Sequence, residues 1–480
     1  MYKRHTFFIF FLLLIIGFGG GRASAAEYMQ LSGVIHVHST FSSGKYSIGE
    51  LVSRAENKNL EVLILTDHDQ VVMEYGLFPF RNLIKRREER QSVLLAGPEK
   101  YLAEIERLNR QQPSVLIIPG VQSSPFYYWT GKPFGKGLTA HNFRKELLIV
   151  GMSTPDDYYN LPLLHGRTST RYLKDLLPGF LIFIAAFLLS IYLILQKGKM
   201  GICGILIAIF SLAMMVDQHP FKSSRFDPYH GDMGQAPFQV AIDYARSRGG
   251  LVYWAHPESN YSNKGLQMGP VKLMTAHYPE ALIETDNYTG FAALYGDNIT
   301  ATKAGMQWDR ALVQYCSGDR ADPVWGIAGS DFHGGGNGIE LDTFQTVFLV
   351  KNRRQKDVLQ ALERGRLYAV RKAAGFRLSL DQFQIKDDES DKRAILGEEL
   401  AIGRAPVITG RLSATDGGHY SVAVSIIRGG KPIWSFGGQT PLDFKFVDLD
   451  QWSGKTFYRL DASGKVAGQL LSNPIFAVRK

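Results

Sequence analysis

The sequence predicts an α/β fold in which a parallel β/α barrel is interrupted by a transmembrane helical hairpin and followed by a β-sandwich. Three observations support this prediction. Short apolar runs alternate with polar helical stretches, two long uncharged segments lie in mid-chain, and the C-terminal part changes to short alternating segments with glycine turns. With 480 residues and 45% hydrophobic content, the chain is long enough for two or three units with buried cores.

The N-terminus has the layout of a secretory signal. Lys3 and Arg4 precede an apolar run over residues 7–18, and small residues at 23–26 offer a cleavage site before Glu27. We therefore expect residues 1–26 to be a signal peptide. An uncleaved anchor with the same orientation is the alternative.

Two uncharged segments predict a transmembrane hairpin over residues 178–216. They cover 178–196 and 200–216, and each is close to the roughly 20 residues that cross a hydrocarbon core. The connecting loop carries Lys197 and Lys199 and no acid, so the positive-inside rule places it in the cytoplasm. We therefore expect a bacterial inner-membrane protein, in contact with membrane lipid, whose parts before and after the hairpin lie on the periplasmic or extracellular side.

The barrel is expected in two parts, over residues 27–177 and 217–375. The expected strands cover 33–37, 61–66, 114–119, 147–151, 251–254, 281–285, 324–328 and 343–350, and the later helices cover 236–248, 300–315 and 354–364. Polar residues gather just beyond the strand ends, as at the rim of a parallel barrel where active sites lie. The glycine-rich alternating segments after residue 375 predict a β-sandwich over 376–480.

The net charge of +9 raises the question of nucleic-acid binding. The densest basic run, residues 85–90, contains acids as well, and we interpret it as the exposed face of a helix. The expected location outside the cytoplasm also argues against nucleic acid as a partner. With only Cys203 and Cys316, the chain has no disulfide framework.

Four polar clusters containing histidine follow predicted strands, at His36-Val37-His38, Asp67-His68, His256-Pro257 and Asp331-Phe332-His333. Each cluster alone is explained equally well by ordinary surface or core histidines, but four at strand ends indicate a metal site. Imidazole and carboxylate ligands without thiolate suit zinc, manganese or iron in an open hydrolytic site. Such a site lowers the pKa of bound water to about 7, which predicts hydrolysis of a small-molecule ester by metal-activated water.

The order of these motifs resembles the PHP (polymerase and histidinol phosphatase) superfamily. The matching segments are His36-Val37-His38-Ser39, Thr66-Asp67-His68, Gly120-Val121-Gln122, His256-Pro257 and Gly329-Ser330-Asp331-Phe332-His333. The likeness covers about residues 31–371 without the hairpin, and residues 472–476 resemble the end of the β-domain in the carbaryl-hydrolase-like (CehA/McbA) branch. The resemblance implies a distorted seven-stranded β/α barrel that holds up to three metals.

Three departures from the family pattern argue against a full trinuclear centre. Gln122 replaces the family's bridging glutamate, and Ser43 replaces an acid that would bind the third metal. The family's mid-domain histidine is missing, with Glu146 or His141 as the nearby substitutes and Glu146 in the better register with Gly151. We therefore expect one or two divalent ions.

The resemblance implies a set of metal ligands, which are His36, His38, His68, Gln122, Glu146, His256, Asp331 and His333. Asp67 is the expected catalytic residue, orienting His68 or accepting a proton from the attacking water, and Glu284 is a candidate for the outer shell. The leading hypothesis is a membrane-anchored hydrolase of phosphoesters or of carboxylic or carbamate esters. The alternative, favoured by Gln122 and Ser43, is a catalytically impaired sensor or binding protein.

Overall fold

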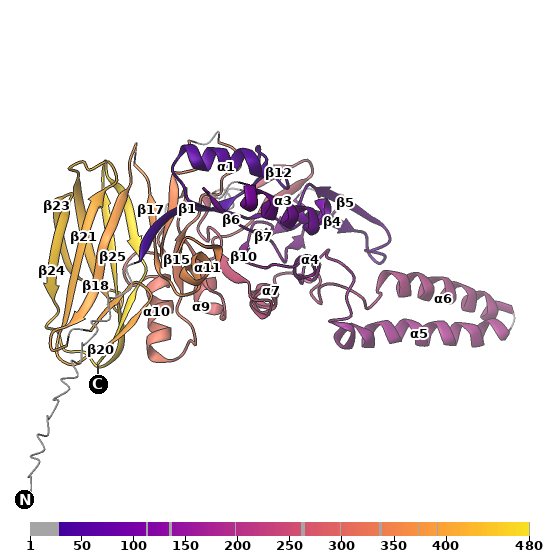
Figure 1. The fold of residues 1–480 in the computed structure, drawn as a ribbon. Helices are drawn as coiled ribbons and strands as arrows, with labels where there is room; N and C mark the ends of the chain where they lie inside the picture. The colour runs from indigo at the N-terminus through magenta and orange to yellow at the C-terminus, as the bar shows by residue number, and fades with distance from the viewer. Residues whose placement is uncertain are drawn as a thin grey trace, which may run out of the picture.

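The computed structural model describes residues 28–479, apart from 112–113, 134–136, 197, 261–264, 298, 336–337, 374 and 391. A β-rich C-terminal region, a central α/β part and a projecting pair of helices follow one another along the molecule (Figure 1). The expected signal peptide over residues 1–26 lies outside the described residues, as does Lys197 of the loop between the two helices.

Two sheets form the centre of the α/β part. In the first, β1 (Met29–Val37) lies between β2 (Val62–Leu65) and β16 (Phe344–Val350), with β6 (Leu116–Ile118) beyond β2. The second sheet has the order β15-β14-β11-β10-β7-β3. Its strands are β15 (Trp325–Ala328), β14 (Gly290–Leu294), β11 (Leu251–Trp254), β10 (Leu147–Val150), β7 (Gly120–Ser123) and β3 (Asp67–His68).

Side chains from both sheets fill the space between them, which explains why these strands are continuous apolar runs in the sequence. Ile35 and Ile64 of the first sheet share one buried cluster with Leu148, Tyr253 and Ile327 of the second. The neighbouring residues of the same strands face the surrounding helices in a second cluster. Strands buried on both faces lose the alternation of apolar and polar residues.

The expected parallel arrangement is wrong for part of these sheets. Strand β10 is antiparallel to both β7 and β11, and β1 is antiparallel to β16. The sheets approach each other where Thr66 joins β2 to β3 and where Val37 forms a single bridge to Phe332. Among the described residues the ladders do not form one continuous ring, and the closed seven-stranded barrel stays a prediction.

The helices of this part cover the sheets with amphipathic faces. Helix α1 (Ile48–Asn57) begins at Ser47, which forms a capping box with Glu50, and its residues Leu51, Val52 and Ala55 are buried. The other helices outside the projecting pair are α2 (Val93–Ala96), α3 (Pro98–Gln111), α4 (Pro155–Tyr159), α7 (Ala236–Ser247), α9 (Ala281–Glu284), α10 (Gln307–Ser317) and α11 (Gln355–Glu363).

Two sequence predictions about local structure are wrong. Residues 281–285, expected as a strand, form the short helix α9, and the strand of this region is β14. The three apolar residues at 281–283 are too short a run for periodicity to separate helix from strand. The expected helix over 300–315 begins only at Gln307.

The basic run is also a strand rather than a helix. Strand β5 (Lys85–Arg90) is exposed along its whole length and pairs with β4 (Val71–Gly76), whose residues alternate between buried and half-buried. Glu74 of β4 lies opposite Arg87 and accepts hydrogen bonds from Lys85 and Arg87, so cross-strand charge pairs stabilise the strand form. A further small sheet contains β8 (Tyr128–Thr130), β9 (Thr139–His141), β13 (Val271–Met274) and β12 (Leu266–Met268).

The C-terminal region is β-rich, as expected, and two sheets share its core. One sheet contains β18 (Leu378–Asp387), β19 (Arg393–Ile395), β21 (Pro406–Ala414) and β24 (Leu442–Val447). The other contains β17 (Leu367–Arg371), β20 (Glu399–Ile402), β22 (Ser421–Arg428), β23 (Lys431–Gln439), β25 (Gly454–Gly464), β26 (Gly468–Ser472) and β27 (Ile475–Arg479). Gly429 and Gly430 turn the chain from β22 to β23 with positive φ, which favours glycine.

The second of these sheets continues without a break into the α/β part. Strand β17 pairs with β16 on one side and with β26 on the other, so the sheet crosses the expected boundary at residues 375 and 376. The buried Arg459 guanidinium donates two hydrogen bonds to the Asp309 carboxylate of α10. The two parts are therefore joined by shared strands and by a buried ion pair.

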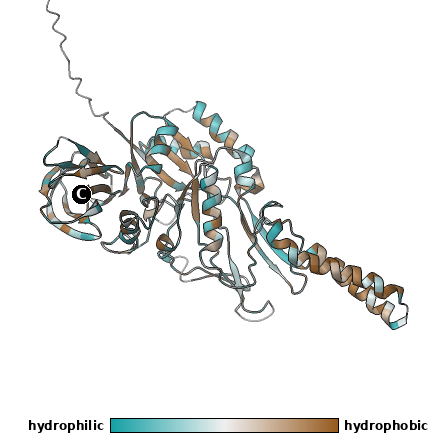
Figure 2. Cartoon of the chain, turned by 90° about the horizontal axis from the view of Figure 1, so that it is seen from below, coloured by the Kyte–Doolittle hydropathy of each residue, from teal (hydrophilic) through white to brown (hydrophobic). Residues whose placement is uncertain are grey.

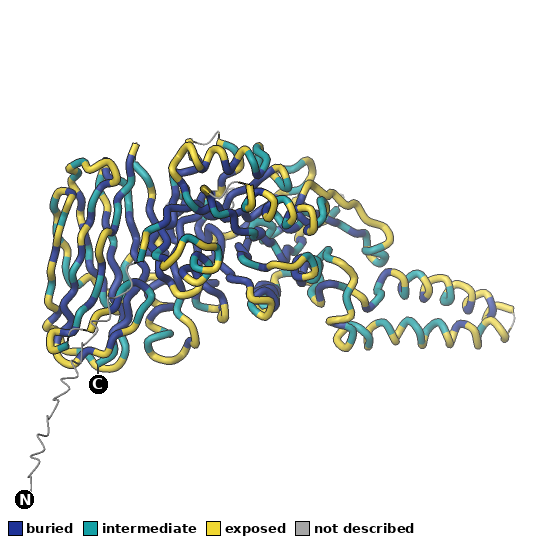
Figure 3. The backbone as a smooth tube through the Cα atoms, viewed as in Figure 1, coloured by how far each residue is buried: buried dark blue, intermediate teal, exposed yellow. Residues whose placement is uncertain are grey.

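The projecting helices are α5 (Leu173–Leu195) and α6 (Gly198–Asp217), which pack against each other. Figure 2 shows them as the longest continuous hydrophobic stretch of the chain, and Figure 3 shows them largely uncovered by the rest of the protein. By length and composition, both helices are suited to crossing a membrane. Helix α6 includes the whole of the expected segment 200–216, and α5 includes the expected segment 178–196 except for Gln196.

Candidate metal centre

The backbone brings two of the polar clusters together across the gap between the central sheets. Phe332 donates its N–H to the carbonyl of His36 and accepts from the N–H of His38, with both distances 3.0 Å. His36, His256 and Asp331 all have positive φ, at 70°, 21° and 49°. Such conformations cost about 1–3 kcal/mol each in residues with a side chain and gather at functional sites.

Five residues form two overlapping groups that share the Asp331 carboxylate. One group is His36, His256 and Asp331, the other is His38, Asp331 and His333, and the potential ligand atoms of each lie within 4.8 Å of one another. The Asp331 Oδ1 atom lies 3.2 Å from Nε2 of His36, 3.7 Å from Nε2 of His38 and 3.2 Å from Nε2 of His333. Asp331 is thus placed between two potential cation positions.

Two serines orient the histidines of the second group. The Nδ1 atom of His38 lies 3.3 Å from Ser42 Oγ, whose own proton goes to Asp67 Oδ1 at 2.6 Å. Because the Ser42 hydroxyl has one proton, it accepts from Nδ1–H, and the Nε2 atom of His38 is left as a lone-pair ligand. Ser43 Oγ forms a hydrogen bond of 2.9 Å with Nδ1 of His333 and turns the Nε2 atom of that ring towards Asp331.

The buried imidazoles are suited to metal binding by their protonation state. Burial lowers the pKa of His36 to about 4 and also lowers the pKa of His38 and His68, so these rings are neutral at pH 7. The Nε2 atoms of His36 and His38 are buried without a hydrogen-bond partner in the protein. A bound cation would satisfy both atoms, so the residues present fit a metal.

Gln122 and Glu146 lie beside His256 at the edge of the first group. Gln122 Nε2 donates to Glu146 Oε2 at 2.7 Å, and the same carboxylate oxygen lies 3.2 Å from Nε2 of His256. Burial disfavours a charged His256, but the hydrogen bond and the charge of Glu146 outweigh it and raise the pKa of His256. His141 lies in a different sheet, where it bonds Thr130, so of the two expected substitutes only Glu146 reaches the site.

Asp67 and His68 lie beside the second group of three residues. The Asp67 carboxylate is buried and accepts hydrogen bonds from the N–H and hydroxyl of Ser39 and from the hydroxyl of Ser42. These contacts are those of a positioning residue for His38, and the role of proton acceptor stays a prediction. The His68 ring lies 4.7 Å from the His38 ring but belongs to neither group of three.

Three functional candidates were missed by sequence reasoning. Ser42 and Ser43 orient histidines, and Asp69 is a fully buried acid whose N–H bonds the carbonyl of Gln122. Burial raises the pKa of Asp69 to about 7. The position of Asp69 as the fourth consecutive polar residue in Thr66-Asp67-His68-Asp69 could have indicated that it belongs to the site. Glu284, by contrast, is exposed and bonds Gln235 outside the centre.

The sequence over residues 35–168 matches the PHP domain family, which confirms the resemblance inferred from the motifs. No curated protein matches the chain. Among solved structures, it is similar to a two-domain protein from Bacteroides vulgatus that contains a predicted PHP-like metal-dependent phosphoesterase. The identity is 12% over 93% of this chain and 94% of that chain, and the TM-score is 0.37.

The chain is also similar to a predicted metal-dependent phosphoesterase from Bifidobacterium adolescentis. The identity is 15% over 64% of this chain and 90% of that chain, and the TM-score is 0.29. Both likenesses are distant. The matched stretch contains His36, His38 and His68, whereas His256, Asp331 and His333 follow it in the sequence. Residues 35–168 thus match the PHP domain family, and the candidate metal centre also includes residues from beyond that stretch.

Proposed function

We propose that this chain is a metal-dependent hydrolase of phosphoesters. The observation that carries the proposal is the pair of three-residue groups that share Asp331. A carboxylate shared by two sets of imidazoles suits two neighbouring divalent cations, and the absence of thiolates favours zinc, manganese or iron. When bound, such cations polarise a phosphoryl oxygen and lower the pKa of a bound water to about 7.

The protein supplies orientation and an opening for the substrate. His36 and His38 form a buried floor, whereas the side chains of Asp331 and His333 are 44% and 40% exposed. The substrate would therefore approach from the side of Asp331 and His333. Ser42 and Ser43 hold their histidines in one orientation, which reduces the reorganisation needed for binding.

The charge of the ligand set favours a phosphoester over a carboxylic or carbamate ester. The only carboxylates among the candidate ligands are Asp331 and Glu146, because Gln122 is neutral. Two divalent cations would leave an excess of about two positive charges at such a site. An anionic phosphoester is attracted by this excess, whereas an uncharged ester is not.

The proposal includes membrane anchoring through α5 and α6. At 1.5 Å per residue, their 23 and 20 residues give lengths of about 35 and 30 Å, which match a hydrocarbon core. Lys197 lies between the two helices in the sequence and Lys199 lies in the first turn of α6, which supports a cytoplasmic loop and a catalytic part outside.

The test is metal content and turnover on protein purified in detergent. Chromogenic phosphomonoester, phosphodiester and carboxylic ester substrates would be compared for wild type, a His36→Ala and His38→Ala double variant, and His230→Ala. His230 is an exposed histidine outside the centre, paired with Asp227, and serves as the matched control.

We expect bound metal and phosphoester turnover in wild type and His230→Ala, and loss of both in the double variant. Turnover of the carboxylic ester alone would refute the substrate class. Folded wild type with neither metal nor turnover would refute the hydrolase and favour a binding protein.

A further inference from the structure

We propose that the loop over residues 77–84, between β4 and β5, is a second membrane-contacting element that inserts into the headgroup layer beside α6. The proposal rests on the membrane placement of α5 and α6 and is independent of the hydrolase activity. It assigns the protein a bilayer-facing surface beyond its two apolar helices.

The loop is fixed to the body-side end of α6. The N–H groups of Asn82 and Leu83 donate to Asp217 Oδ1 at 2.7 and 3.1 Å, and the Asn82 side chain donates to the Asp217 carbonyl at 2.8 Å. Asp217 is the last residue of α6, and it is fully buried by these contacts. The loop therefore keeps a defined position relative to the helix.

The loop also runs along α6 rather than only touching its end. The Phe80 ring meets the Phe210 ring edge to face, with the centroids 5.7 Å apart. Phe210 lies seven residues before Asp217, which corresponds to about 10 Å along the helix axis. The interfacial layer on each side of the hydrocarbon is only about 5–8 Å thick. If α6 crosses the hydrocarbon, part of this loop reaches the hydrocarbon boundary.

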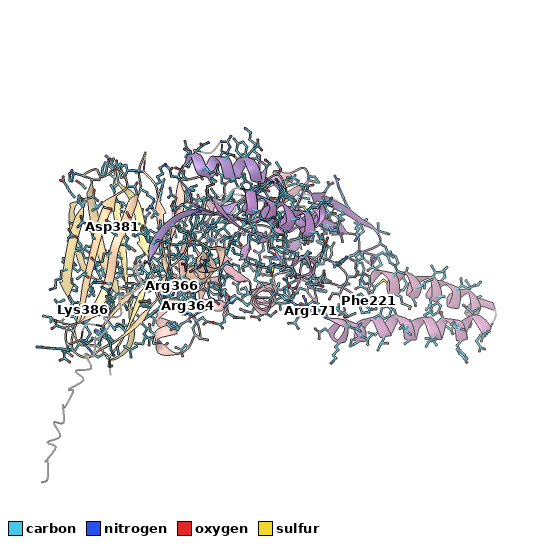
Figure 4. The ribbon with its side chains drawn as sticks, in the orientation of Figure 1. Arg171, Phe221, Arg364, Arg366, Asp381 and Lys386 are labelled. Atoms are coloured by element: carbon cyan, nitrogen blue, oxygen red, sulfur yellow. The ribbon has the colours of Figure 1, made fainter. Side chains whose placement is uncertain are left out.

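The outer side of the loop is apolar and uncovered. Phe78 is 82% exposed, and Leu83 and Ile84 are exposed as well. Phe221, also exposed, lies where the hairpin joins the body, close to the labelled Arg171 (Figure 4). Large apolar side chains that gather at the base of two apolar helices form the kind of surface that enters a bilayer interface.

Basic residues lie within the apolar loop and on its C-terminal side. Arg81 lies in the loop itself, with its guanidinium 5.7 Å from the centre of the Phe78 ring. The exposed strand β5 that follows carries four cations and two acids. A basic segment next to inserted apolar side chains adds electrostatic attraction to an anionic membrane surface.

The β4–β5 pair is held firmly against the catalytic part. The buried Glu74 carboxylate bonds Lys85, and the Glu74 carbonyl accepts from the Trp129 indole. Strand β4 begins three residues after His68. Insertion of the loop would therefore hold the metal centre at one orientation to the bilayer. An anchor of two helices alone would restrict this orientation less.

Site-directed spin labelling of the full chain tests this proposal, because Cys203 and Cys316 are the only cysteines. Three single-cysteine proteins would be placed in phosphatidylcholine vesicles containing a minority of phosphatidylglycerol. One keeps Cys203 in α6, one carries Phe78→Cys, and one carries Leu449→Cys in the C-terminal region, where the native side chain is 76% exposed. Relaxation by oxygen and by a water-soluble nickel complex reports the depth of each label.

We expect the Phe78→Cys label to favour oxygen over nickel, as the Cys203 label in α6 does, in contrast to the aqueous Leu449→Cys label. A Phe78→Cys label as accessible to nickel as Leu449→Cys, with Cys203 in lipid, would overturn the loop proposal alone. Protection of the Phe78→Cys label from both reagents already in detergent would assign the surface to a second copy instead. An aqueous Cys203 label would overturn the membrane placement and the loop proposal together. None of these outcomes depends on turnover.

Discussion

Replacing Ser42 with alanine should weaken metal binding although it removes no metal ligand. The Ser42 hydroxyl donates to the Asp67 carboxylate at 2.6 Å and accepts from His38 Nδ1 at 3.3 Å. Without it, His38 is free to place its proton on Nε2, the atom that faces Asp331. Loss of such an outer partner lowers metal affinity about 10–100-fold, which equals about 1.4–2.8 kcal/mol.

The same substitution should also lower the free energy of unfolding of the metal-free protein. A hydrogen bond to a charged group contributes about 1.5–3 kcal/mol, and Asp67 keeps its two bonds from Ser39. Competition of zinc between the protein and a chromogenic chelator measures the affinity, and urea unfolding measures the stability. Ser53→Ala is the matched control, since Ser53 is an exposed serine of α1 that bonds only the Gly49 carbonyl.

One combination of results would refute the orientation of His38 by Ser42. If Ser42→Ala lowers stability but binds zinc as tightly as wild type, while His38→Ala loses binding, the serine supports Asp67 without orienting the ligand.

Three other predictions concern charge in buried places. Asp309→Ala leaves the buried Arg459 guanidinium with one ion pair, to Asp461, and should lower the free energy of unfolding by about 1.5–3 kcal/mol, whereas Asp443→Ala at an exposed pair should cost less than about 1 kcal/mol in urea unfolding. Gln122→Glu adds a carboxylate next to Glu146 and should raise the zinc stoichiometry or affinity in elemental analysis, and an unchanged metal content would contradict this. Burial lowers the pKa of His165 to about 4, so the unfolded chain binds more protons between about pH 6.5 and 4. As the pH is lowered through that window, the free energy of unfolding should fall by up to about 1.4 kcal/mol per pH unit. His165→Gln should make this fall shallower.

The sequence allowed the main strands and the two apolar helices to be predicted, because burial on both faces and long uncharged segments leave a clear pattern. Sequence patterns did not predict the elements whose secondary structure or pairing depends on tertiary contacts. The run over residues 85–90 has no apolar alternation, and its strand form depends on pairing with β4 and on Glu74. The continuation of one sheet from β16 through β17 to β26 was also invisible, because strand pairing across more than 90 residues leaves no local trace.

Two of the three departures from the family pattern, Ser43 and Gln122, take part in hydrogen bonds at the candidate centre. Ser43, which lacks the acid of the family, bonds Nδ1 of His333 and holds its Nε2 atom towards Asp331. Gln122 links Glu146 at the His256 side of the centre, where a second carboxylate 2.7 Å from Glu146 would be repelled unless a cation lay between them. Both replacements therefore maintain the geometry of the ligands while they reduce the negative charge around them. The orienting hydrogen bonds of His38 and His333 are present, and they favour the proposed hydrolase with a more positive centre over an impaired sensor.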